Sequence, residues 1–255
     1  MIDSLTIASK KSHSYSDDLA YVHDNGFTVF ARTAGRELLR IFRRHGIRDG
    51  LVVDIGCGTG VLAEILVAAG YRVLGIDISP SMLKLARKRA PTATFGLGSL
   101  FDSPLPKCDA ITCTGECLNY LFDSSNTLSR LDKLFTRAYE ALRPGGVFVF
   151  DVLESLGAGT RSGMVFRTGT DWVVLVNKIE DRSRHTLTRE ITTFRRVGSL
   201  YRRSDEIHAA KIFQKGQFPE MLRRLGFIVR VQRGYGAKTV APGHVVVLAR
   251  RSAGR

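Results

Sequence analysis

The sequence predicts an α/β fold, a doubly wound and mostly parallel sheet with an N-terminal helical cap and an antiparallel β insert. Strand-like and helix-like segments alternate over residues 51–152, as they do where crossover helices join parallel strands. After Val152 long strand-like runs separated by turn residues replace this alternation, which indicates antiparallel pairing. The 255 residues are enough for one large α/β domain with a substantial core.

The first half is divided into elements by its apolar spacing and by glycine and proline. Residues 14–46 are expected to be helical, since apolar side chains recur at helical spacing and Gly46 can end the last helix. Ser79 followed by Pro80 is typical of a helix start. The expected strands span residues 51–55, 72–76, 93–95, 110–113 and 147–152. The expected helices between them span residues 61–69, 80–90 and 128–142.

The second half predicts three long strands and then a return to the α/β pattern. These strands span residues 172–180, 186–197 and 200–213. A helix over residues 218–225 and strands over 228–233 and 244–249 follow. We therefore expect a helical cap over residues 1–48 and a main domain over 49–255, which contains a β-rich lid at about 157–213.

Composition limits the classes of function. The net charge of +14 comes from Lys and Arg scattered along the chain, which favours a solvated surface over a nucleic-acid interface. No apolar run is long enough to span a membrane, and residues 1–11 lack the apolar core of a signal peptide. The four cysteines lack metal-ligand spacing, so we expect no metal site and reduced thiols in a cytoplasmic protein.

A glycine-rich turn follows the first strand and indicates a ligand site. Asp54 ends the strand, and Gly56, Gly58 and Gly60 occupy every second position before the next helix. Such glycines let a ligand lie directly on the backbone, where a Cβ atom would collide with it. A dinucleotide fingerprint would need its third glycine at position 61, which is Val61.

A second acidic residue, Asp77, ends the second strand. In a doubly wound sheet this position lies beside the ribose of a bound nucleoside, where a carboxylate can accept hydrogen bonds from both hydroxyls. Asp77 alone does not separate S-adenosylmethionine from NAD, because both carry a free ribose diol.

Three segments together resemble the class I S-adenosylmethionine-dependent methyltransferases, although they do not indicate the acceptor. They are Asp54 to Gly60, Gly75 to Ser79 with Met82, and Leu142 to Gly146 followed by an apolar strand. The resemblance implies S-adenosylmethionine as cofactor, a Rossmann-like fold and a seven-stranded sheet with a reversed last strand. It implies cofactor contacts from Tyr21, Asp54, Gly56, Gly58, Gly60, Asp77, Ile78, Met82, Ser99, Leu100 and Thr114.

The sequence departs from this family at the residue after Gly98. Many members carry an acid there, which binds the adenine amino group, whereas this chain has Ser99. The Ser99 hydroxyl or the Leu100 backbone would have to replace that contact.

The acceptor is expected beside residues 114–120, the loop after the fourth strand. The loop lacks the signature of nucleic-acid amino-methyltransferases, and no Pro-Cys nucleophile occurs. It resembles the loop of small-molecule N- and O-methyltransferases, including those acting on amino sugars, and this resemblance implies methylation of N or O in a small molecule. Candidates for contacting the acceptor or removing its proton are Glu116, Tyr120 and His208. Structural roles remain open for Glu116 and His208, and Tyr15 or Tyr21 can cover the cofactor or belong to the core.

Three alternatives remain open at this level. The basic insert leaves room for an anionic acceptor, and the overall charge leaves room for a tRNA or rRNA methyltransferase. A fold that binds the cofactor without transferring methyl groups is the third. The oligomeric state is not predicted.

Overall fold

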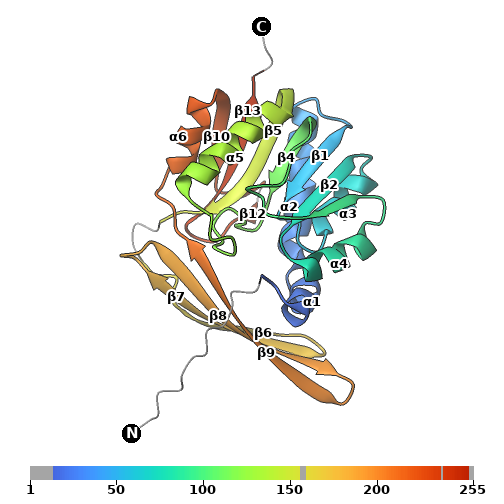
Figure 1. Cartoon of the computed structure of the whole chain (residues 1–255), viewed down its shortest axis with the longest axis vertical. Coiled ribbons are helices and arrows are strands. Elements are labelled where there is room, and N and C mark those ends of the chain that lie inside the picture. The colour runs from blue at the N-terminus through green and yellow to red at the C-terminus, as the bar shows by residue number, and fades with distance from the viewer. Residues whose placement is uncertain (1–13, 156–158, 237, 253–255) are drawn as a thin grey trace.

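A computed structural model describes residues 14–155, 159–236 and 238–252. It confirms the predicted fold class: seven strands form one central sheet in the order β10-β13-β5-β4-β1-β2-β3. Four further strands form a separate antiparallel sheet in the order β6-β7-β8-β9. Figure 1 shows the central sheet between its helices, with the antiparallel sheet and the first helix below it.

The central sheet is parallel except for one reversed strand, which lies next to the strand at one edge. Its strands are β1 (Leu51–Ile55), β2 (Arg72–Asp77), β3 (Thr94–Leu97), β4 (Cys108–Cys113), β5 (Leu142–Leu153), β10 (Phe227–Gln232) and β13 (His244–Arg251). β13 runs antiparallel to both β5 and β10, so the reversed last strand is confirmed. β5 begins earlier than predicted, because Cys108 pairs with Leu142 and Ala110 with Val147, and the proline-glycine segment between them forms an irregularity in the strand.

Helices cover both faces of the central sheet. They are α2 (Thr28–Arg44), α3 (Val61–Ala68), α4 (Pro80–Arg89), α5 (Leu128–Ala141) and α6 (Gln217–Arg224). The expected start of α4 is confirmed, since the Ser79 hydroxyl accepts a hydrogen bond from the Met82 amide at 3.2 Å. One core cluster packs Phe135 and Phe218 against Phe148 and Phe150 of β5, and a second packs α2 and α3 against the opposite face.

The N-terminal residues contribute to two different layers. α2 packs in the core cluster of the central sheet through side chains that include Leu38 and Phe42. α1 (Asp17–Gly26) instead packs Leu19 and Val22 against Trp172 of the antiparallel sheet. Residues 1–13 of the predicted cap lie outside the described residues.

The antiparallel sheet has one strand more than predicted. Its strands are β6 (Gly163–Thr168), β7 (Trp172–Asp181), β8 (Thr186–Val197) and β9 (Leu200–Lys211). β6 was missed because it is an edge strand with every residue exposed, so no alternation of apolar and polar residues marks it. A short hairpin of β11 (Gly234–Tyr235) and β12 (Lys238–Thr239) was also missed.

β9 joins the antiparallel sheet to the loop that follows β4. Leu121 donates a backbone hydrogen bond to Ala209 at 2.8 Å, and Lys211 donates one to Asn119 at 2.7 Å. An isolated bridge pairs Tyr120 with Ala210 between them. The insert therefore lies against the loop where the acceptor is expected.

Candidate cofactor and acceptor site

A cavity with a volume of about 310 Å³ opens at the carboxyl ends of the parallel strands. Ligands bind at this edge in doubly wound sheets. The predicted cofactor residues that line it are Gly56, Gly58, Asp77, Ile78, Met82, Ser99, Leu100 and Thr114. Tyr21, Asp54 and Gly60 do not line it. Among the predicted acceptor residues, Tyr120 lines the cavity, whereas Glu116 and His208 do not.

The three glycines of the turn meet three different demands. All three have positive φ angles, of 73° at Gly56, 54° at Gly58 and 76° at Gly60. A Cβ atom on Gly56 would lie 2.4 Å from the Cys117 sulfur, and one on Gly60 would lie 2.9 Å from the Ala86 Cα. Only Gly58 has open space where a Cβ would stand. The packing of this chain therefore already requires glycine at positions 56 and 60, whether or not a ligand is bound.

Asp77 holds the turn together while facing the cavity. Its Oδ2 accepts the Gly58 amide and its Oδ1 accepts the Ser79 amide, each at 2.8 Å. Burial raises the pKa of this carboxyl, and the backbone hydrogen bonds partly offset that rise. The carboxylate can still accept hydrogen bonds from a ligand, because two donors do not use all of its lone pairs.

Asp54 lies behind the cavity wall. Its side chain is buried and accepts a hydrogen bond from the Thr112 hydroxyl at 2.6 Å. Burial raises its pKa to about 7, and the nearby Asp77 charge adds to the rise. Asp54 therefore supports β1 and β4 where both strands reach the cavity.

Tyr21 faces the antiparallel sheet. Its hydroxyl donates to Asp171 at 2.8 Å, and the Arg195 guanidinium lies 3.6 Å from its ring centre. These contacts attach α1 to the insert, so the predicted contact between Tyr21 and a cofactor has no geometric support.

Aromatic rings form the wall nearest the insert. The hydroxyl oxygens of Tyr15 and Tyr120 lie 3.4 Å apart, and the Phe122 ring stacks on Tyr120 with centres 4.7 Å apart. Burial raises the pKa of both tyrosines, so both phenols stay protonated and can donate and accept hydrogen bonds. All three of these residues line the cavity, as do Phe27 and Phe30.

His208 lies behind this aromatic wall. Its ring centre is 4.8 Å from that of Tyr15 and 4.7 Å from that of Phe122, and its side chain is buried. Its Nε2 lies 2.8 Å from Oε2 of Glu206, whose other oxygen accepts the Ser16 amide. The histidine therefore packs the wall and links the insert to the segment that carries Tyr15.

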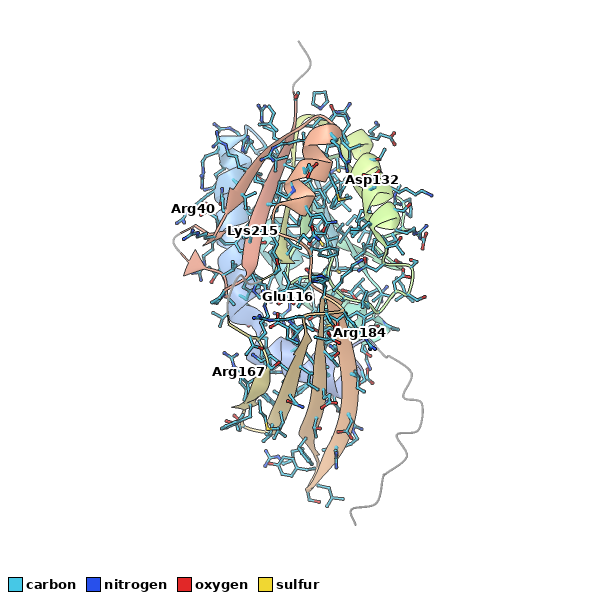
Figure 2. The ribbon with its side chains drawn as sticks, turned by 90° about the vertical axis from the view of Figure 1, so that its left-hand side faces the viewer. Arg40, Glu116, Asp132, Arg167, Arg184 and Lys215 are labelled. Carbon is cyan, nitrogen blue, oxygen red and sulfur yellow. The ribbon has the colours of Figure 1, made fainter. Side chains whose placement is uncertain are left out.

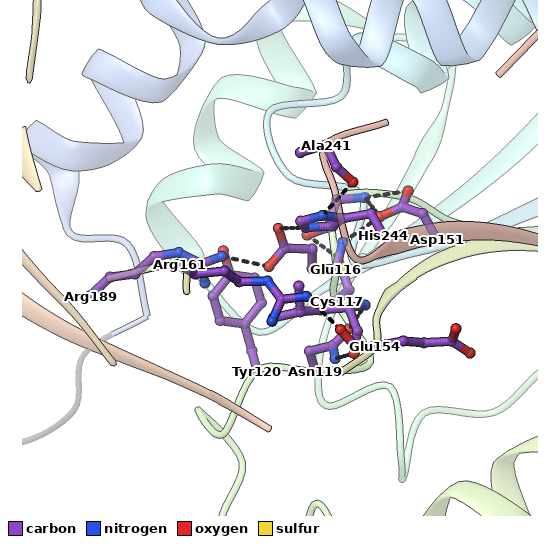
Figure 3. A network of polar contacts seen from close by, with 12 residues as sticks. Glu116, Cys117, Asn119, Tyr120, Asp151, Glu154, Arg161, Arg189, Ala241 and His244 are labelled. Carbon is purple, nitrogen blue, oxygen red and sulfur yellow. Dashed lines mark hydrogen bonds and ion pairs between the residues drawn. The ribbon is translucent and has the colours of Figure 1, made fainter. Parts of the chain in front are cut away.

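Glu116 is the centre of a network between three parts of the chain (Figure 3). Its Oε1 lies 2.6 Å from Nε2 of His244 on β13, and its Oε2 accepts a hydrogen bond from Arg189 on β8 at 2.7 Å. Burial would raise its pKa, but His244 and Arg189 outweigh burial and lower the pKa to about 2. A carboxylate held in this way is a poor proton acceptor. Figure 2 shows Glu116 at the level where the two sheets meet.

Several residues of the site were not found from the sequence. Asp151 accepts the amides of Gly115 and Glu116 and the hydroxyl of Tyr235, so it fixes the loop after β4. The Arg189 guanidinium lies 5.7 Å from the ring centre of Tyr120. The only sequence signal for Asp151 was its position as an acid within the apolar run of β5, because its partners are distant in the chain.

The charge of the cavity wall is opposite to that of the whole chain. Asp77 and Asp123 line the cavity, while no Lys or Arg occurs among the described lining residues. Within residues 14–155, 159–236 and 238–252, no group of three or more His, Cys, Asp or Glu side chains is placed so that it could hold a metal ion. No helix of the described chain is long and apolar enough to cross a membrane.

The cavity fits S-adenosylmethionine in its chemistry. Open space above Gly58 leaves the backbone of the turn accessible, and Asp77 offers a carboxylate to a ribose diol. Aromatic faces and carboxylates suit a sulfonium cation, whereas Lys or Arg would repel it.

Comparison with known proteins identifies the class to which the fold and cavity belong. Residues 52–146 match the model of a methyltransferase domain. A putative methyltransferase of Geobacillus sp. (strain WCH70) is 28% identical over 200 residues, which cover 75% of this chain and 78% of the relative. The chain therefore contains a methyltransferase domain, and solved S-adenosylmethionine-dependent methyltransferases share its fold.

Two further proteins are similar over most of the chain. The dTDP-3-amino-3,6-dideoxy-alpha-D-glucopyranose N,N-dimethyltransferase of Streptomyces fradiae is 26% identical over 231 residues, covering 86% of this chain and 88% of the relative. The structure of S-adenosylmethionine-bound CalS10, an amino pentose methyltransferase from Micromonospora echinaspora, superposes with a TM-score of 0.72. At 19% identity it covers 94% of this chain and 98% of that chain.

Proposed function

We propose that this methyltransferase methylates the nitrogen of a small amine-bearing acceptor, such as an amino sugar. The observation on which the proposal depends is the aromatic wall that includes Tyr120, in a cavity with no Lys or Arg among its described lining residues. A polar amine fits this wall, whereas an anionic group would find no Lys or Arg among these lining residues to pair with. The long alignments with two enzymes named for amino sugars support the same class of acceptor.

The chemistry requires alignment and the loss of one proton. The nitrogen lone pair attacks the methyl carbon, the carbon–sulfur bond breaks, and its electron pair stays on sulfur as the sulfonium becomes a neutral thioether. The new N–C bond leaves nitrogen positively charged until it releases a proton. Aromatic faces stabilise cationic groups, so rings beside the reacting atoms suit both the donor and the product.

Tyr120 is proposed as the acceptor contact that orients the amine. Its hydroxyl faces that of Tyr15 inside the cavity, where it can accept a hydrogen bond from the amine. His208 and Glu116 are proposed as positioning residues, since His208 packs against Tyr15 and Glu116 holds Arg189 beside Tyr120.

The remaining site residues are proposed for the donor. Asp77 would accept the ribose hydroxyls, Gly58 would allow close approach of the donor, and Ile78 with Met82 would contact the adenine. The proposal also assigns a lid role to the insert at about 157–213, together with the cap over 1–48, because the described parts of both meet at the aromatic wall. It places the enzyme in the cytoplasm, where the four free cysteines would stay reduced.

Methylation of a panel of acceptors tests the function. Nucleotide-linked amino sugars, the matching hydroxy sugars and total tRNA should be incubated with the enzyme and labelled donor. We expect N-methylated amino sugar by mass spectrometry. Methylated RNA or O-methylated sugar without any N-methylated product would contradict the proposal.

Tyr120→Phe tests the role of the phenol, and Tyr21→Phe is its matched control. Loss of the Tyr120 hydroxyl should lower kcat by about tenfold or more, because one hydrogen bond in the transition state is lost. Affinity for S-adenosylhomocysteine should stay within about threefold. Tyr21→Phe should change neither quantity, since Tyr21 does not line the cavity.

A further inference from the structure

A carboxylate from a different loop lies beside Ser99 in the wall of the cavity. The Ser99 hydroxyl donates a hydrogen bond to Oδ2 of Asp123, and both residues line the cavity. Asp123 belongs to the segment after β4 that also supplies Tyr120 and Phe122 to the aromatic wall. The hydrogen bond therefore brings a negative charge to the end of the cavity beyond β3.

The Asp123 side chain is held in place and keeps capacity to accept hydrogen bonds. Its Oδ1 accepts the Ser125 amide at 2.8 Å, and its Oδ2 accepts the Ser99 hydroxyl. Burial would raise the pKa of Asp123, but the hydrogen bonds from Ser125 and Ser99 outweigh burial and lower it, so the group is ionised at neutral pH. An ionised carboxylate offers about four lone-pair positions, so two donors leave room for a ligand.

Ser99 orients the carboxylate and is itself fixed. Its Oγ accepts the Phe101 amide at 3.1 Å while it donates to Asp123, so both of its hydrogen-bonding directions are set by the protein. A hydroxyl used in this way has its proton committed to the carboxylate. The charged group, rather than Ser99, is the stronger acceptor available to a ligand N–H.

We propose that Asp123 recognises the adenine of S-adenosylmethionine by accepting a hydrogen bond from its exocyclic amino group, with Ser99 as the residue that positions it. Recognition of the donor base then depends on the loop that forms the acceptor wall.

Binding of two nucleosides that differ only at this group tests the proposal. S-adenosylhomocysteine carries an amino group at C6, whereas its purine-riboside analogue carries only a hydrogen atom there. Calorimetry on the wild-type protein should show at least about tenfold tighter binding of the adenine compound, the size of one hydrogen bond to a charged group. Asp123→Asn should remove most of this preference, because a neutral amide oxygen accepts a weaker hydrogen bond than a carboxylate does.

Asp102→Asn is the matched control, because Asp102 pairs with Arg130 and does not line the cavity. It should keep the wild-type preference. A wild-type protein without the preference, an Asp123→Asn protein that retains it, or an equal loss in Asp102→Asn would each overturn the proposal. Asp123→Ala gives a second test, since it should lose the preference through weaker binding of the adenine compound alone. No acceptor is used, so the result is independent of the proposed amine substrate.

Discussion

Asp77 has two tasks at the level of the single residue. In the ligand-free fold its carboxylate already accepts two backbone amides, from Gly58 and Ser79. A substitution of Asp77 will therefore remove ligand contacts and also the contacts that shape the turn.

Asp77→Ala should weaken binding of S-adenosylhomocysteine by about 2–4 kcal/mol, because two charge-assisted hydrogen bonds to the ribose are lost. It should also lower the melting temperature of the ligand-free protein, since two buried amides lose their acceptor. Asp77→Asn keeps one acceptor oxygen, so its ligand-free melting temperature should fall less. Calorimetry and thermal melts measure the two effects, and an alanine variant within threefold of wild-type affinity would show that the ribose assignment is wrong.

Residue identity predicted the cofactor side better than the acceptor side. Asp77, Gly58 and Met82 lie in one local segment each, so their place follows from the strand and turn that contain them. Tyr21 and Glu116 were assigned from a single feature of the sequence, but their side chains turn toward partners on the insert and on β13. Contacts between distant segments have no local signal, so the partners of these two side chains could not be predicted.

At the level of elements, Glu116 connects the loop after β4 with β8 and β13. Arg189 and His244 contact its two oxygens, and Asp151 and Arg161 are the other charged groups near this network. The pKa of Glu116 is lowered to about 2, and Glu116 raises the pKa of His244 above its ordinary 6.5 despite burial. Both shifts make the connection between these elements depend on pH.

The contribution of the Glu116–His244 pair to stability should be largest between about pH 4.5 and 6.5. The lowered pKa of Glu116 gives stability that is present above its ordinary value of 4.5 and lost as pH falls toward 2. The raised pKa of His244 gives stability that is complete below 6.5 and lost as pH rises through the folded-state value. Thermal melts of wild type and His244→Gln should therefore differ most in this window and less at pH 9.

Glu116→Gln is the control for that pH dependence. Without the carboxylate, His244→Gln should no longer destabilise the protein more at pH 5.5 than at pH 9, as in a double-mutant cycle. An equal difference between wild type and His244→Gln at pH 5.5 and pH 9 would contradict an ionic pair.

Element prediction succeeded where periodicity is strong and failed where burial is absent. β1, β4 and β5 are buried and apolar, so the sequence marks them clearly. β6 is exposed throughout and pairs only with β7, so its strand conformation comes from the neighbouring strand. Edge strands of this kind depend on tertiary context more than on their own residues.

Across the whole molecule, the net charge is positive, whereas the charged side chains that line the cavity are carboxylates. The formal charge of +14 is carried by the surface, while the described cavity wall carries carboxylates only. The net charge of the chain therefore did not indicate its ligand. The expectation of S-adenosylmethionine rather than NAD came instead from the spacing of the glycines in the turn.

S-adenosylhomocysteine should raise the stability of the whole fold, and NAD should not. A ligand at one hundred times its Kd adds about 2.7 kcal/mol to the free energy of unfolding. A thermal melt over a ligand series measures this directly, with the Asp77→Ala protein as the control that responds less. Stabilisation by NAD alone would mean that the donor assignment is wrong.

The hydrogen bond between Ser16 and Glu206 determines the order in which parts of the site can form during synthesis. These residues are separated by 190 positions, and their hydrogen bond joins the segment that carries Tyr15 to the strand that carries His208. The strands that form the donor side lie within residues 51–113 and leave the ribosome much earlier. A chain under synthesis can therefore build its donor pocket first, while the aromatic wall waits for β9. The aromatic wall therefore becomes complete only after residues 200–211 have been synthesised.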